Sequence, residues 1–180
     1  DLDYFYRIYQ LMKDSYRPIL KIPTTQLEHT YDQISIVAIL GMVVGALWSF
    51  LNLPDIIPIH WNIIGEADGF GSKYWIALLP TLAVLFYYGK VQLVKIPHKY
   101  NYVKRITPDN AKSEYIFGRK IIRLVHLLSQ LVFFLIFFFT IKGALSGDQD
   151  MGIYTMLLIY LVLAVPLILV VRRYSGDTIN

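Results

Sequence analysis

The residue types best suited to chemistry lie in a short polar stretch between two apolar segments. His60 is followed by Glu66 and Asp68, and one imidazole with two carboxylates is a ligand set that Zn²⁺ accepts. The spacing matches no strong metal motif, so a structural interpretation competes: His60 hydrogen-bonds the loop backbone while Asp68 pairs with Lys73. We therefore predict no cofactor and no metal, and keep a metal site at His60, Glu66 and Asp68 as the alternative.

A second polar set lies inside an apolar segment further along the chain. Arg119, Arg123, His126 and Gln130 follow one another at spacings of four, three and four, which places them on one helix face. Ionisable groups at membrane depth face a bundle interior or a water-filled path. This polar stripe (Arg119, Arg123, His126 and Gln130) has two interpretations. It is either a conduit for protons or small solutes, or a network of structural hydrogen bonds with the arginines at the lipid headgroups. We favour the network, because no Asp or Glu lies in the predicted spans to complete a relay.

The usual catalytic machinery is missing from the chain. There is no cysteine among the 180 residues, which excludes thiolate nucleophiles and thiolate metal sites. No nucleophile elbow, phosphate-binding loop, dinucleotide fingerprint or HExxH motif occurs. We predict that the protein is not an enzyme, and a metal-dependent membrane enzyme at His60 is the alternative.

The apolar residues are gathered into segments long enough to cross a bilayer. Hydrophobic residues make up 56% of the chain and charged residues 17%, and about 20 helical residues span the hydrocarbon core. We predict an all-α integral membrane protein whose domain over 33–180 has four transmembrane helices, at about 34–53, 74–94, 121–141 and 153–171. Lys90, near the end of the second segment, is expected to extend its ammonium group to the membrane interface.

Two further patterns concern small residues in the first span and apolar residues in the N-terminal region. In the first span, Gly41, Gly45 and Ser49 recur every four residues, which predicts close helix packing within the bundle or against a partner subunit. The N-terminal region over 1–32 begins with apolar residues at helical spacing over 2–16. This spacing predicts an amphipathic helix on the membrane surface, or one docked on a partner protein.

The basic residues are distributed very unevenly about the spans. Fifteen of the 17 Lys and Arg residues flank the spans on one side, and an excess of positive charge marks the cytoplasmic side. We predict cytoplasmic N- and C-termini, with the 54–73 and 143–152 loops outside. The basic 90–123 region is then explained by topology and contact with anionic lipid, and not by nucleic acid.

The 54–73 loop is predicted to be folded, because prolines and glycines punctuate it and 57–61 alternates like a short extended segment. Its pattern resembles the signature of a bacterial membrane family of undefined function, a domain that forms the N-terminal part of SdpI-like proteins. These proteins give immunity to a secreted antimicrobial toxin. The residues that carry the resemblance are Pro54, Asp55, Pro58, His60, Asn62, Gly65, Asp68, Gly69 and Lys73. A second match, in the predicted cytoplasmic loop, falls on Asn101, Tyr102, Thr107, Asn110 and Tyr115.

The resemblance implies a multi-pass protein of the bacterial cytoplasmic membrane. We expect a non-catalytic accessory subunit or immunity-type factor that binds a protein or peptide through the 54–73 loop and through its cytoplasmic surfaces. Its partners are then the lipid bilayer and a membrane protein or peptide, and a homo-oligomer is compatible with the sequence. The alternatives are the conduit along the third span and the metal-dependent enzyme at His60.

Overall fold

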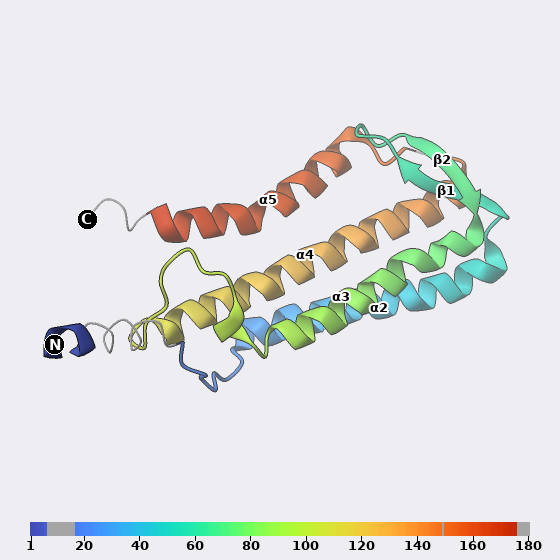
Figure 1. Ribbon diagram of the computed structural model, residues 1–180. Helices are drawn as coiled ribbons and strands as arrows, with labels where there is room; N and C mark the ends of the chain where they lie inside the picture. Colours follow the sequence, from blue (N-terminus) through green and yellow to red (C-terminus); the bar gives the residue numbers. More distant parts are fainter. Residues whose placement is uncertain (7–16, 149, 176–180) are drawn as a thin grey trace.

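The computed structural model describes residues 1–6, 17–148 and 150–175. It is mostly helical (Figure 1), and four helices are long and apolar enough to cross a membrane, as in a multi-pass membrane protein. The predicted amphipathic helix over 2–16 falls mostly on 7–16, which lie outside the described residues; residues 2–6 are helical. The elements in chain order are α2 (Gln26–Asn52), β1 (Ile56–Trp61), β2 (Ala67–Ser72), the 3₁₀ turn η1 (Lys73–Ala77), α3 (Leu78–Leu93), the 3₁₀ turn η2 (Pro97–Lys99), α4 (Ala111–Ser146) and α5 (Ile153–Ser175).

Two of the spanning helices begin well before the predicted positions. α2 begins after Thr25, whose hydroxyl accepts from the Glu28 amide at 3.3 Å while the Glu28 carboxylate accepts from the Thr25 amide at 2.8 Å. This reciprocal pair satisfies backbone donors at the helix start. α4 extends over 36 residues and ends at Gly147, where φ is 72°, a backbone conformation in which glycine carries no steric cost. Both helices therefore include charged residues that a search for charge-free segments leaves out.

The bundle is organised around α4. It packs most extensively against α2 and then α3, while its contact with α5 is smaller, and the helices run side by side in Figure 1. A Cβ added at Gly45 would lie 2.8 Å from the Phe137 ring, and one at Gly41 would lie 3.2 Å from Phe134. Ser49 is buried and donates to the Gly45 carbonyl at 2.7 Å. The small-residue face predicted in the first span thus packs within the bundle, against α4.

One element departs from the all-helical prediction. β1 and β2 form a two-stranded antiparallel sheet with Ile57 opposite Gly71 and Pro58 opposite Phe70. It caps one end of the bundle, while 17–25, the 95–110 loop and the end of α5 lie at the other end (Figure 1). The hairpin turn is also tied to the segment before α5, since the Met151 amide donates to the Gly65 carbonyl at 2.8 Å.

Candidate functional site

The turn of the hairpin is built by Asn62 and Gly65. The Asn62 side-chain oxygen accepts from the amides of Ile64 and Glu66 at 3.1 and 3.0 Å, and its amide nitrogen donates to the Glu66 carboxylate at 3.0 Å. Gly65 has a φ of 95°, which glycine adopts without strain. An Asn side chain that bonds its own backbone in this way fixes a turn. These two residues of the signature therefore fold the loop.

The base of the hairpin is closed by Lys73. Its ammonium group contacts the Asp55 carboxylate at 3.2 Å and donates to the Leu53 carbonyl at 3.3 Å, while its amide donates to the Asp55 carbonyl at 2.8 Å. Lys73 thus joins the end of the hairpin to the end of α2. Pro54 is exposed at the exit from α2, whereas Pro58 is fully buried in β1.

His60 and Asp68 form a pair across the two strands. The imidazole Nδ1 lies 2.5 Å from the Asp68 carboxylate, and both side chains are largely exposed. The predicted pairing of Asp68 with Lys73 is therefore wrong, because the strand register places Asp68 beside His60. Gly69 allows this approach: a Cβ there would lie 2.9 Å from the His60 Cβ.

The Glu66 carboxylate, the third member of the proposed metal set, accepts a hydrogen bond from the side-chain amide of Asn62. Within the described part of the chain, no group of three or more His, Asp or Glu side chains is placed to hold a metal ion. The geometry at His60 is that of an exposed histidine–carboxylate contact on a hairpin.

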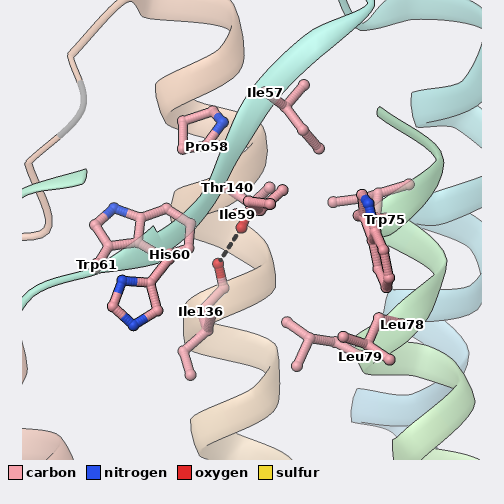
Figure 2. Close-up of a pocket in the computed structure, with 11 residues that line it drawn as sticks. Ile57, Pro58, Ile59, His60, Trp61, Trp75, Leu78, Leu79, Ile136 and Thr140 are labelled. Carbon is pink, nitrogen blue, oxygen red and sulfur yellow. Dashed lines mark hydrogen bonds between the residues drawn. The ribbon is translucent and has the colours of Figure 1, made fainter. Parts of the chain in front are cut away.

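An apolar cavity of about 390 Å³ lies between β1, η1, the first turn of α3 and the C-terminal part of α4. Figure 2 shows side chains from these elements around it, with Trp61 and His60 on the β1 side and Trp75 across from them. Trp75 is 57% exposed. The remaining lining residues are Ile57, Pro58, Ile59, Ile76, Leu78, Leu79, Ile136 and Thr140. The volume is in the range that accepts a large apolar group.

Sequence reasoning missed the α4 wall of this cavity. Ile136 and Thr140 lie far along the chain from the hairpin, in a run of apolar residues without local distinction. The Thr140 hydroxyl donates to the Ile136 carbonyl at 3.0 Å, as Figure 2 shows, so its polarity is satisfied within the helix. The cavity surface at this point is therefore apolar, and no sequence signal marks it.

A network of buried charges ties α2, α3 and α4 together at the end of the bundle opposite the hairpin. The Glu28 carboxylate accepts from Arg119 at 2.9 Å and from Arg123 at 2.6 Å. The Asp32 carboxylate accepts from Arg123 at 3.2 Å and from Lys90 at 2.7 Å. Glu28 is 0% exposed and Lys90 4%, so each charge depends on its partners, since an unpaired buried charge is costly.

This network corrects three expectations. The first membrane helix begins at Gln26, so it contains Glu28 and Asp32, and the prediction that the spans lack acids is wrong. The arginines pair inside the bundle with these carboxylates of α2, where the prediction placed them at the lipid headgroups. Lys90, expected to extend its ammonium group outward, is buried against Asp32 and over the Tyr87 ring, 4.1 Å from its centre.

The deeper part of the stripe lies between α3 and α4. The Gln130 amide donates to the Ala83 carbonyl at 3.1 Å and contacts the His126 Nε2 at 3.1 Å. The His126 ring packs edge-on against Tyr87. The four residues of the stripe share one buried face, as their spacing predicts, and the face is covered by α2 and α3.

The second signature mainly folds the loop before α4. The Asn110 side-chain oxygen accepts from the Thr107 amide at 2.9 Å, and the Thr107 hydroxyl oxygen accepts from the Asn110 amide at 3.4 Å. Tyr115 is fully buried and packs with Ile106 and Tyr102, whereas Asn101 is exposed. Four residues of this signature, Tyr102, Thr107, Asn110 and Tyr115, therefore have structural partners here.

The neighbouring Tyr100 shows how tightly this loop is packed. Its hydroxyl donates to the Leu93 carbonyl at 2.7 Å, its ring stacks on Tyr102, and burial raises the pKa of Tyr100 to about 12. The loop is thus a folded cap on the end of α3.

These features define a multi-pass membrane protein with a hairpin over an apolar cavity and a charge network at the other end. Residues 36–84 match a family described as Domain of unknown function (DUF1648). The matched segment covers most of α2, the hairpin and the first part of α3, so it includes the first signature and not the second. No curated protein matches the chain, and no solved structure matches it.

Proposed function

We propose that the protein is a non-catalytic membrane accessory subunit or immunity-type factor that binds a partner polypeptide through the hairpin. The observation that carries the proposal is the apolar cavity beneath β1. Binding sites for protein partners centre on a pocket that takes one large apolar anchor, surrounded by a polar rim. Here the apolar walls form the pocket, and the His60–Asp68 pair supplies a polar group beside it.

The exposed surface of the hairpin supports a polypeptide as the occupant. Ile59, Phe70 and Trp75 are large apolar side chains with at least two fifths of their surface exposed. Ile59 and Trp75 line the cavity, and Phe70 lies on the neighbouring strand opposite Pro58. Aromatic side chains are common at the centres of interfaces. A partner would cover these side chains and place an apolar anchor among them.

The resemblance to SdpI-like proteins, together with the family match over 36–84, supports the immunity-type form of this proposal. In this form the occupant is a secreted antimicrobial peptide or the protein that carries it. The protein then lies in the bacterial cytoplasmic membrane, with the hairpin outside and both termini in the cytoplasm. The distribution of Lys and Arg supports that orientation.

Purification in mild detergent followed by mass spectrometry of the associated chains tests the proposal. Leu78 lines the cavity and is 46% exposed, so Leu78→Trp fills the opening without disturbing the core. We expect this variant to recover about one tenth of the partner or less, since blocking an anchor pocket removes about 2 kcal/mol. The matched control is Leu161→Trp on the exposed face of α5. Equal recovery by the two variants, or no associated chain with the wild type, would contradict the proposal.

Two histidine variants distinguish this proposal from the conduit and from the metal-dependent enzyme. The conduit requires His126→Ala to abolish function while assembly is retained, and the metal enzyme requires the same of His60→Ala. The pairing of the stripe with Glu28 and Asp32 supports a structural role for it. We therefore expect His126→Ala to lower stability and leave partner recovery per folded molecule unchanged.

A further inference from the structure

A second cavity, of about 620 Å³, lies at the end of the bundle opposite the hairpin. Its walls come from the extended segment before α2 and from the chain that follows α3. Lys21, Lys95 and Arg119 line it, and among the described residues that form its walls none is acidic. The rest of the lining is apolar, formed by Ile19, Leu20, Ile22, Pro23, Val94 and Pro97. A cavity with basic and apolar walls suits a ligand that is both anionic and apolar.

The charges behind the cavity leave a positive excess. The buried network holds three cations, Lys90, Arg119 and Arg123, against the two carboxylates of Glu28 and Asp32. Arg119 belongs to both the network and the cavity wall. Lys21 and Lys95 are exposed and add two positive charges at the opening. An anion between these lysines would compensate charge that the surrounding carboxylates leave unbalanced.

The position of the cavity identifies the source of the anion. α3 ends at Leu93 and α2 begins at Gln26, so the cavity lies at the ends of two membrane-spanning helices, the level at which lipid phosphates lie. Ile19 is 76% exposed beside it and offers an apolar surface toward the acyl region. We infer that the cavity formed by 19–23 and 94–97 binds the phosphate group of an anionic phospholipid, with Lys21 and Lys95 as its ligands.

Native mass spectrometry of the full chain, purified and delipidated in detergent, tests this assignment. The probes are short-chain phosphatidylglycerol, short-chain phosphatidylcholine and inorganic phosphate. We expect the wild type to bind phosphatidylglycerol in preference to phosphatidylcholine. Lys21→Gln with Lys95→Gln should weaken phosphatidylglycerol binding about 30-fold, since each basic residue near an anionic lipid contributes about 1 kcal/mol.

The matched control removes two charges from the same end of the protein. Lys99 and Lys112 are also exposed and lie outside the cavity lining, so Lys99→Gln with Lys112→Gln should change binding by less than about threefold. Equal losses in the two double variants would overturn the assignment, because binding would then follow total charge. Equal binding of phosphatidylcholine, or displacement of the lipid by inorganic phosphate at the same concentration, would overturn it too.

Discussion

Glu28 is a buried charged residue that joins α2 to α4. Its carboxylate is fully buried and accepts hydrogen bonds from Thr25, Arg119 and Arg123. The same side chain therefore completes the start of α2 and holds two guanidinium groups of α4. Replacing a buried ion network by apolar residues can be neutral, but removing one member leaves its partners charged and unpaired.

Glu28→Ala tests this dependence. We expect the free energy of unfolding to fall by about 3–5 kcal/mol, because Arg119 and Arg123 lose a buried carboxylate. Denaturant unfolding in a fixed detergent measures the change. Asp109→Ala, at an exposed carboxylate in the loop before α4, is the control and should change stability by less than about 0.5 kcal/mol. Similar values for the two variants would show that the network does not stabilise the fold.

The residue scale also shows where sequence reasoning succeeded and where it failed. The spacing of the stripe correctly places Arg119, Arg123, His126 and Gln130 on one face, because helical periodicity is local information. It could not supply the partners, since Glu28 lies 91 residues from Arg119 and outside the charge-free segment. His60 and Asp68 were recognised as chemically capable, but the strand register that joins them was not predicted.

At the scale of elements, the contact between α2 and α4 decides how closely the bundle packs. Gly45 faces the ring of Phe137, with 2.8 Å between the ring and an added Cβ, and Phe137 belongs to the hydrophobic core. The four-residue spacing of small side chains predicted this kind of contact. It did not identify the facing helix, because the aromatic run in α4 has rings on every side.

Substitution of glycines in two helices tests the contact. Gly45→Leu should destabilise the protein by about 1–3 kcal/mol, because the added side chain overpacks the interface with Phe137. Gly89→Leu in α3 is the matched control, since an added Cβ there meets nothing within 4 Å. Thermal unfolding in detergent measures both. A Gly45→Leu variant as stable as Gly89→Leu would contradict the close packing of α2 on α4.

Across the whole molecule, the two ends of the bundle differ in chemistry. The hairpin end has exposed apolar side chains and an apolar cavity, while the other end has the basic cavity and the ion network. The unequal distribution of Lys and Arg was readable from the sequence. The burial of Glu28 was not, because Arg119 and Arg123, which pair with it, lie far along the chain in α4.

Cysteine labelling tests the proposed orientation, because the sequence has no cysteine and each variant then carries a single labelling site. Ile63 in the hairpin turn and Val103 in the 95–110 loop are 72% and 71% exposed, so they are matched positions at opposite ends. In intact cells a membrane-impermeant maleimide should label Ile63→Cys, and it should label Val103→Cys only after permeabilisation. The reverse pattern would invert the proposed topology.

The ion network also has a consequence for how the protein is made. The carboxylates of α2 leave the ribosome long before the arginines of α4, because 91 residues separate Glu28 from Arg119. Until α4 is present, Glu28 and Asp32 lack the guanidinium groups that they pair with inside the bundle. We expect the N-terminal end of α2, which carries Glu28 and Asp32, to stay near the aqueous surface while α2 enters the bilayer. It takes its final position in the bundle only after α4 has been inserted. The ion network therefore forms only after α4 has been synthesised, and we expect that a chain truncated before α4 cannot form it.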